Sequence, residues 1–125
     1  MVPDDRKYTQ EHEWVQVEGD VGTVGITDHA TAELGDIVYV ELPETGSEFS
    51  AGDSVGTIES VKAVADLFLP VSGEIIEVNE AVTDSPELLG SSPMDDGWLL
   101  KVRLAEPSEL ERLLDAAGYE ELLGG

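Results

Sequence analysis

Residues 54–69 read Ser-Val-Gly-Thr-Ile-Glu-Ser-Val-Lys-Ala-Val-Ala-Asp-Leu-Phe-Leu, and this stretch decides the fold. Two β-rich runs, residues 54–59 and 64–69, flank the short link 60–63. A link of this length predicts a β-hairpin that carries Lys62 at or near its tip. The link lacks the Asn-Gly or Asp-Gly pair that usually marks a two-residue loop, so the sequence leaves the turn type open.

Lysine is rare in this chain, which contains only Lys7, Lys62 and Lys101. A lysine on a protruding hairpin suits a carrier protein, because its long side chain gives an attached cofactor reach while the hairpin fixes the root of the arm. Tethering also raises the effective concentration of the reactive group near a docked partner. A solvated loop lysine without a function fits the same position, and composition and spacing do not decide between the two.

Further strand-like runs surround the hairpin. Bounded by turn signals, they predict strands at residues 13–17, 21–26, 37–42, 75–78 and 99–104, with Trp14 as a buried anchor. Residues 35–40, Gly-Asp-Ile-Val-Tyr-Val, resemble residues 73–78, Gly-Glu-Ile-Ile-Glu-Val. Two similar strand–turn units predict a mainly β fold in which two small antiparallel sheets form a pseudo-symmetric sandwich.

Helical signals occur at two places. Thr27 is a suitable N-cap for a short helix near residues 28–34, and Gly35 stands where a helix C-terminal glycine belongs. A C-terminal helical segment is predicted at about residues 108–123, packed on the β-core. Within it, Ser108 begins a Ser-x-x-Glu capping box, and leucines recur at helical spacing up to a closing Gly118.

Composition predicts one domain over residues 1–125, with a core at about residues 8–105, because 41% of the residues are hydrophobic. No apolar run is long enough to span a bilayer, and the polar N-terminus resembles neither a signal peptide nor a presequence. We therefore expect a cytoplasmic protein.

The charge balance is extreme, with 28 acidic against 6 basic residues and a formal net charge of −22. Nucleic acid and anionic membrane surfaces are excluded as partners, because both require clustered cations. The acidic residues are spread along the whole chain, which favours a solvated surface suited to high salt over a docking face for a basic partner. A halophilic source is the resulting expectation.

Thiol and metal chemistry have few candidates. The chain has no cysteine, so no disulfide, thiolate zinc site or cysteine nucleophile exists. His12 and His29 are the only histidines, and they form neither an HExxH motif nor a nucleophile–base pattern. The sequence therefore predicts no metal site and no catalytic residue, and any redox chemistry has to come from an attached group.

The motif Glu59-Ser60-Val61-Lys62-Ala63 resembles the lipoylation motif of glycine cleavage H proteins. The similarity continues in the same order along residues 8–123. It is carried by His12-Glu13-Trp14-Val15, residues 24–30 and 34–38, Val40-Glu41-Leu42-Pro43, residues 70–74, Val78-Asn79, Gly97-Trp98 and residues 108–110. Two positions depart from the family pattern: Met94 follows Pro93 where many members have an aromatic residue, and Glu33 stands where some members have histidine.

This resemblance implies a lipoyl-domain-like barrel-sandwich hybrid that is a carrier and not an enzyme. Lys62 would carry lipoate in amide linkage after the action of lipoylating enzymes. The arm would shuttle the aminomethyl group of glycine from a pyridoxal-phosphate glycine decarboxylase (P protein) to a tetrahydrofolate-dependent aminomethyltransferase (T protein). Dihydrolipoyl dehydrogenase (L protein) would then reoxidise it.

The resemblance also implies a cleft that shelters the loaded arm from water. By position, Glu13 and Asp66 would line this cleft, with Glu11 at its edge. A carboxylate near a protonated amine is physically sensible. The alternatives are that Asp66 is an outward strand residue and that Glu13 is a solvated acid beside Trp14.

Other carriers are the nearest competing interpretation. Lipoyl domains of 2-oxo-acid dehydrogenases usually have Asp-Lys-Ala and biotin carriers Met-Lys-Met, whereas here Val61 and Ala63 flank the lysine. A lipoyl-transfer donor, a plain interaction module and a carboxylate-pair hydrolase remain open, although chance Asp and Glu pairs are inevitable in so acidic a chain.

Overall fold

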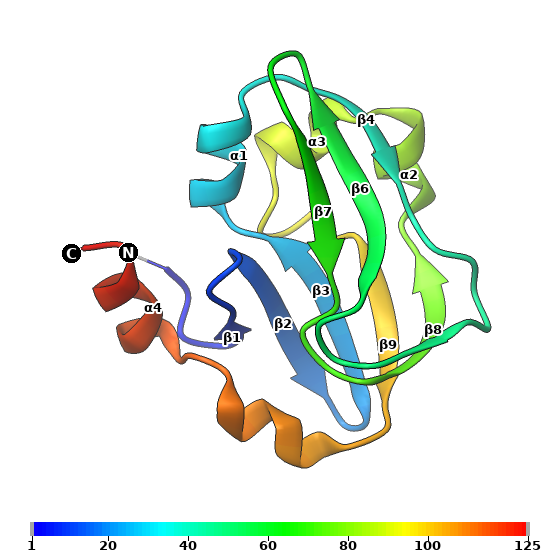
Figure 1. Ribbon diagram of the computed structural model, residues 1–125, viewed down its shortest axis with the longest axis vertical. Coiled ribbons are helices and arrows are strands. Elements are labelled where there is room, and N and C mark those ends of the chain that lie inside the picture. The colour runs from blue at the N-terminus through cyan, green and yellow to red at the C-terminus, as the bar shows by residue number, and fades with distance from the viewer. Residues whose placement is uncertain (1, 125) are drawn as a thin grey trace.

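The alternating apolar runs form two antiparallel sheets in the computed structural model, which describes residues 2–124 (Figure 1). The larger sheet comprises, in spatial order, β1 (Lys7–Tyr8), β2 (Glu13–Glu18), β3 (Val21–Ile26), β9 (Leu100–Leu104), β8 (Gly73–Val78) and β5 (Glu48–Phe49). The smaller sheet comprises β4 (Ile37–Glu41), β6 (Ser54–Ser60) and β7 (Val64–Phe68). The predicted mainly β fold with two antiparallel sheets is confirmed, and in the described part of the chain neither sheet closes into a barrel.

The main core lies between these sheets. Ile58 and Leu67 of the smaller sheet and Val24, Ile75 and Val102 of the larger one are each no more than 2% exposed. Full burial of such an aliphatic side chain contributes about 1.5–3 kcal/mol. Because both sheets supply inward-facing residues, the β6–β7 hairpin is fixed by the same core that joins the sheets.

A second cluster packs on the outer side of β2, where Trp14 meets the two ends of the chain. Trp14 is 1% exposed and lies with Tyr8 and Tyr119, whose rings stack at 4.7 Å. The Trp14 indole Nε1–H donates to the carbonyl of Ile26 at 2.9 Å. The prediction that Trp14 is a buried anchor is confirmed.

The first helix matches its predicted caps. Helix α1 (Asp28–Leu34) begins after Thr27, whose Oγ1 accepts a hydrogen bond from the Ala30 amide at 3.3 Å. It ends at Gly35, where φ is 81°, a value that glycine adopts without strain.

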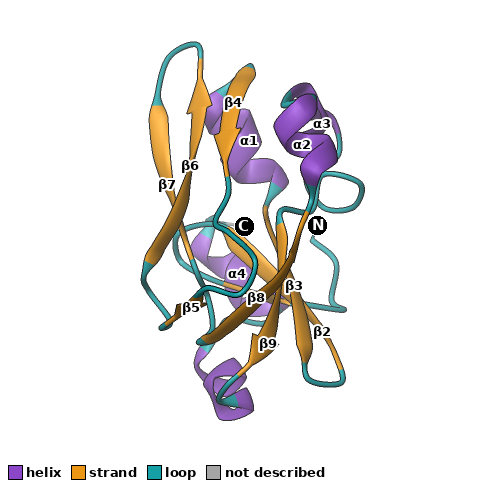
Figure 2. Cartoon of the chain, turned by 90° about the vertical axis from the view of Figure 1, so that its right-hand side faces the viewer, coloured by secondary structure: helices purple, strands orange, loops and turns teal. Residues whose placement is uncertain are grey.

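Two further helices, α2 (Glu80–Asp84) and α3 (Glu87–Ser91), have no counterpart in the sequence prediction. Each spans five residues and buries a single large side chain, Val82 and Leu89. One buried residue per helix produces no helical periodicity, so pattern analysis misses them. Both contact β4, and they gather with α1 at the end of the molecule toward which the β6–β7 hairpin points (Figures 1 and 2).

The C-terminal helical segment exists, but its predicted capping is wrong. A 3-10 helix, Pro107–Arg112, is followed by a break and then by α4 (Ala116–Leu122). Ser108 caps neither helix, and Gly118 lies inside α4, where its amide donates to the capping Asp115 at 2.8 Å. Leu114 forms the break because its main chain exchanges two 2.8 Å hydrogen bonds with Tyr8, a strand pairing that a helix cannot make. Within residues 2–124, no helix is long and apolar enough to cross a membrane.

Candidate functional site

Lys62 occupies the tip of the β6–β7 hairpin, as predicted. Glu59 pairs with Val64, and the Ser60 amide donates to the Ala63 carbonyl at 2.8 Å, which leaves Val61 and Lys62 as the loop. The Ser60 hydroxyl lies beneath this loop and accepts hydrogen bonds from the amides of Lys62 (3.3 Å) and Ala63 (3.0 Å). Since neither loop residue has a positive φ, the turn needs no Asn-Gly pair, and the serine hydroxyl replaces that turn chemistry.

The tip rests on the connection between α1 and β4. The Val61 amide donates to the carbonyl of Asp36 at 3.0 Å. A Cβ built on Gly35 would lie 3.6 Å from Lys62 Cε, so the lysine stem passes over this glycine. A hairpin tip held at both its own turn and its neighbour provides a rigid base for the lysine side chain.

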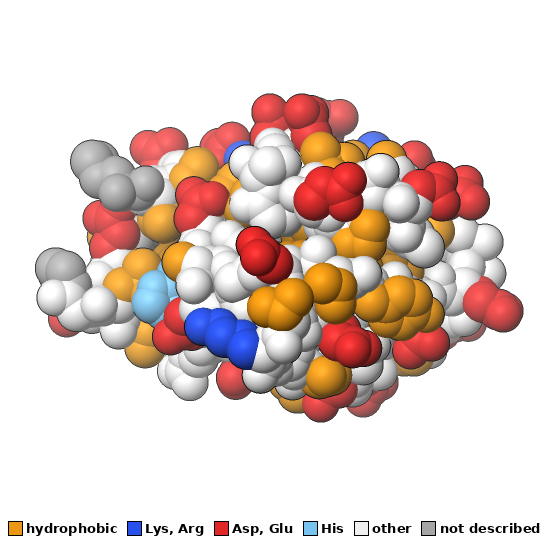
Figure 3. Space-filling model, turned by 90° about the horizontal axis from the view of Figure 1, so that it is seen from above, with side chains coloured by type: hydrophobic (Ala, Val, Ile, Leu, Met, Phe, Trp, Pro, Cys, Tyr) orange, Lys and Arg blue, Asp and Glu red, His pale blue; other side chains and the backbone are white. Residues whose placement is uncertain are grey.

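The Lys62 ammonium group forms no ion pair among residues 2–124. Arg6, Lys101 and Arg103 each form an ion pair with a carboxylate, whereas no carboxylate among residues 2–124 lies within ion-pair distance of Lys62. The side chain is exposed. Figure 3 looks onto this end of the molecule, where a cationic side chain lies beside hydrophobic side chains and carboxylates border both.

Exposed apolar side chains surround the lysine. Val61, which precedes it, and Val64, two positions after it, are 70% and 66% exposed. On the neighbouring strand β4, Val38 and Tyr39 are both 49% exposed, because a bulge between Ile37 and Tyr39 breaks the in–out alternation. Exposed apolar patches of this kind mark contact surfaces for other molecules.

Glu13 is a buried carboxyl at the start of β2. It is 3% exposed, and the Thr9 hydroxyl donates to its Oε1 at 2.6 Å. Burial raises the pKa of Glu13 to about 7, although hydrogen bonds from Thr9 and from the Phe68 main chain lower it. Glu13 is therefore not the solvated acid considered as an alternative, and the influence of the Phe68 main chain on its pKa indicates that it lies near the end of β7.

Asp66 and Glu11, the other two predicted cleft residues, are both exposed. Asp66 is exposed on β7, two residues before Phe68 and opposite Thr57. Glu11 is exposed in the β1–β2 connection, where its amide donates to the Thr9 hydroxyl at 3.2 Å. Of the three predicted cleft residues, Glu13 is thus buried, whereas Asp66 and Glu11 are exposed.

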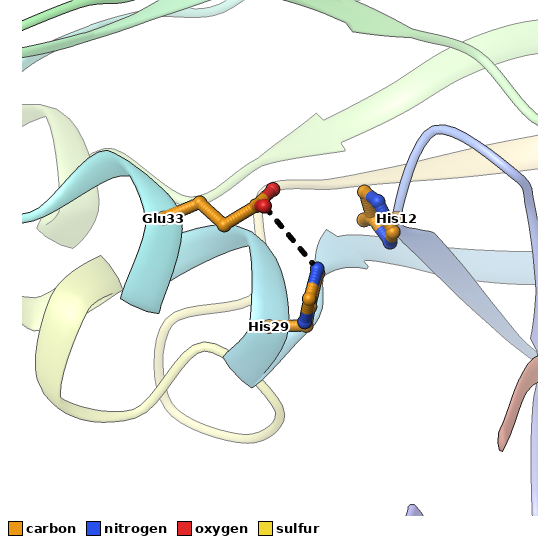
Figure 4. A group of neighbouring side chains, drawn as sticks. All are labelled: His12, His29 and Glu33. Atoms are coloured by element: carbon orange, nitrogen blue, oxygen red, sulfur yellow. Dashed lines mark ion pairs between the residues drawn. The ribbon is translucent and has the colours of Figure 1, made fainter. Parts of the chain in front are cut away.

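A second polar group, which sequence analysis missed, lies beside this region (Figure 4). The side chains of His12, His29 and Glu33 bring one ligand atom each to within 4.8 Å of one another. His29 and Glu33 occupy positions i and i+4 of α1, which put them on one helix face and could have been recognised from the sequence. His12 comes from the β1–β2 connection, and nothing in the sequence pattern predicts that it lies close to His29 and Glu33.

His12 is held firmly in this group. Its φ is 70°, in the left-handed region, and its Nδ1 lies 2.8 Å from the Tyr119 hydroxyl. Burial and the neighbouring His29 lower the pKa of His12, and burial raises the pKa of Tyr119. Both shifts favour a neutral imidazole bonded to a protonated phenol.

The two departures from the family pattern have different surroundings. Glu33 faces His29, with 3.5 Å between Oε2 and Nε2. Met94 packs against the cluster of Trp14 and the two tyrosines, and its carbonyl accepts a 2.7 Å hydrogen bond from Arg6. Neither residue contacts the Lys62 turn through any hydrogen bond or ion pair of the described residues.

The glycine cleavage H-protein family model matches residues 6–124 of this chain. The chain is 53% identical, over 123 residues, to the glycine cleavage system H protein of Carboxydothermus hydrogenoformans, and the match covers 98% of this chain and 95% of that relative. It also resembles the crystal structure of a glycine cleavage system H protein from Mycobacterium marinum, with a TM-score of 0.92 and 42% identity over 99% of this chain and 100% of that chain. A family model that matches nearly the whole chain, together with these relatives in sequence and in fold, shows that this chain belongs to the glycine cleavage H-protein family.

Proposed function

We propose that Lys62 is the attachment residue of this lipoyl carrier of the glycine cleavage system, with lipoate in amide linkage to its Nζ. The observation that supports this most directly is an exposed lysine, free of ion pairs among residues 2–124, at the tip of a two-residue hairpin turn. The residues around it fit an attachment site. Ser60 fixes the loop from beneath, while Val61 and Ala63 leave the ammonium group accessible to a lipoylating enzyme.

The bound group supplies a disulfide that accepts the aminomethyl group of glycine and carries electrons away as a dithiol. The chain itself contributes position: its rigid turn limits where the root of the arm can be. We infer that the partners are the P, T and L proteins and that this chain is not itself catalytic. The exposed apolar residues Val38, Tyr39, Val61 and Val64 around the lysine support docking of those enzymes at this end.

Peptide mass spectrometry tests the attachment residue. Protein produced with an active lipoylating enzyme should gain one lipoyl-sized increment, located on the peptide that contains Lys62. Lys62→Arg should lose the increment completely. Lys101→Arg, which changes a lysine paired with Glu77 at 3.8 Å, should keep it. A lipoyl increment that persists in Lys62→Arg, a biotin-sized increment, or an unmodified native protein would contradict the proposal.

We further propose that Glu13, Asp66 and Glu11 form the sheltering cleft for the loaded arm. The buried Glu13 beside the exposed Asp66 strand supports this arrangement. In lipoylated protein, Asp66→Ala should shorten the half-life of the aminomethyl-loaded form several-fold, because a carboxylate that holds the amine is removed. Asp84→Ala, an exposed acid on α2, serves as the matched control. Equal half-lives for both variants and the wild type would refute the role of Asp66.

We also propose a halophilic source, on the basis of the net charge of −22. At molar salt, repulsion between surface carboxylates is screened within a few Å, so folding becomes less costly. Melting curves should therefore show a Tm that rises steadily from low to molar KCl. Full stability at low salt, with no further rise, would contradict the halophilic assignment.

A further inference from the structure

The group formed by His12, His29 and Glu33 has the composition of a transition-metal site. The His29 Nε2 and Glu33 Oε2 atoms lie 3.5 Å apart, and the His12 and His29 rings lie 4.5 Å apart between centroids. A tetrahedral zinc ion, with bonds of about 2.0–2.1 Å, places its ligand atoms ~3.4 Å apart. The ligand atoms here lie within 4.8 Å of one another, so small side-chain rotations bring all three to that spacing.

A second layer of side chains fixes the orientation of His12. The Tyr119 hydroxyl, 2.8 Å from His12 Nδ1, also lies 2.7 Å from Thr27 Oγ1. The Thr27 amide in turn donates to the His12 carbonyl at 3.0 Å. Tyr119 is fully buried, so this support does not move with the surface. Since Nδ1 is engaged, Nε2 is the nitrogen left for coordination, as in metal sites whose histidines donate their other ring N–H to a neighbour.

The opposite side of the group is free to adapt. His29 and Glu33 are exposed by 38% and 64% of their side chains, and they project from the same face of α1 toward His12 (Figure 4). One fixed ligand and two adjustable ones leave a coordination position open to solvent. The donor set of two imidazoles and one carboxylate suits Zn²⁺, Co²⁺ and related ions, whereas Mg²⁺ and Ca²⁺ prefer oxygen donors alone.

We propose that His12, His29 and Glu33 bind one divalent transition-metal ion of the zinc class, with Tyr119 as a positioning residue for His12. This site is separate from the Lys62 turn and does not depend on lipoylation. Ion binding would join the β1–β2 connection, through His12, to α1, through His29 and Glu33. The excess of negative charge on the chain increases the local concentration of cations around it.

Titration calorimetry with ZnCl₂ on tag-free, chelator-treated full-length protein tests the site. We expect one ion per chain and a Tm that rises with zinc concentration. His29→Gln and Glu33→Gln should each weaken zinc binding at least tenfold. Glu87→Gln, which changes an exposed acid on α3, should leave the affinity unchanged. The Lys62→Arg protein should bind zinc as the wild type does, so failure of the attachment proposal and failure of the metal proposal give different results.

A spectroscopic measurement separates this site from loose cation binding by an acidic surface. Co²⁺ bound by two imidazoles and a carboxylate should give a visible absorption band that His29→Gln abolishes and that a tenfold excess of Mg²⁺ leaves intact. Tyr119→Phe should keep the stoichiometry but lower the affinity and shift this band. Several ions per chain, or zinc affinity that is unchanged in both His29→Gln and Glu33→Gln, would overturn the proposal.

Discussion

Two turns of this molecule use the same local chemistry and reach opposite outcomes. In the lysine tip, residues 60–63, the Ser60 hydroxyl accepts hydrogen bonds from the amides of Lys62 and Ala63. In the β1–β2 corner, residues 9–13, the Thr9 hydroxyl accepts hydrogen bonds from the amides of Glu11 (3.2 Å) and Glu13 (3.1 Å). One turn presents its charged side chain to solvent, and the other turns a carboxyl inward.

Tertiary packing explains this difference. The lysine tip contacts the short connection after α1, through the hydrogen bond from the Val61 amide to the Asp36 carbonyl. The β1–β2 corner is covered by the C-terminal α4, whose Tyr119 bonds to His12, and by the end of β7 at Phe68. A turn organised by a hydroxyl group thus fixes the shape of the backbone, whereas the surrounding elements decide which charged group is buried.

Replacement of the buried carboxyl should have the largest effect on stability. The pKa of Glu13 is about 7 in the folded protein against an ordinary value of 4.5, so the folded state holds a proton that the unfolded chain releases between these values. The contribution of Glu13 to the free energy of unfolding therefore falls as pH rises from 4.5 to 7. Glu13→Gln removes this loss, and at pH 8 it should unfold with a free energy about 3 kcal/mol greater than the wild type, but with little difference near pH 4.

Urea unfolding from pH 4 to 8, with a chelator present, measures this difference. The variant-minus-wild-type curve isolates Glu13 from the titration of the two histidines. Glu59→Gln, an exposed carboxyl beside the lysine tip, should differ from the wild type by less than about 0.5 kcal/mol throughout. A Glu13→Gln difference that stays constant with pH would show that this carboxyl is not desolvated.

Removal of the Thr9 hydroxyl should have the second-largest effect on stability, because this hydroxyl forms hydrogen bonds with three partners in the β1–β2 corner. Thr9→Val keeps the shape but removes the acceptor for two amides and the donor to Glu13 at 2.6 Å. A loss of about 2 kcal/mol in unfolding free energy is expected at neutral pH, since buried groups left without partners keep their desolvation cost. Thr9→Ser, which keeps the hydroxyl, should retain most of the unfolding free energy that Thr9→Val loses. Equal losses for Val and Ser would mean that packing of the methyl group, and not hydrogen bonding, is what matters.

Local signals in the sequence predict the features that local chemistry determines. The hairpin around Lys62 follows from two β-rich runs and a short link, and the α1 caps follow from Thr27 and Gly35. Trp14 as an anchor follows from its size and its place in a strand. Each of these features needs only neighbours within a few positions of the chain.

Features that depend on distant parts of the chain escape the same reasoning. The Leu114 pairing with Tyr8 breaks the C-terminal helix, and no leucine spacing announces a strand partner 106 positions away. Burial of Glu13 requires the end of β7, and the approach of His12 to His29 requires the corner to fold against α1. The lysine tip can thus be predicted from the sequence, whereas the arrangement of the β1–β2 corner is found only in the three-dimensional structure.

The lysine tip should respond least to loss of its hydroxyl. Ser60→Ala removes the acceptor for the Lys62 and Ala63 amides; Ser60 itself is buried, but Lys62 and Ala63 are exposed, so water can reach their amides in the variant. We expect a loss of about 1 kcal/mol, smaller than that of Thr9→Val. Ser54→Ala, at the exposed opposite end of β6, should change stability less still.

Because a looser turn presents Lys62 in more orientations, the initial rate of enzymatic lipoylation should fall several-fold in Ser60→Ala and stay unchanged in Ser54→Ala. If Ser60→Ala were modified at the wild-type rate, rigidity of the turn would have no part in recognition, and exposure of the lysine alone would suffice.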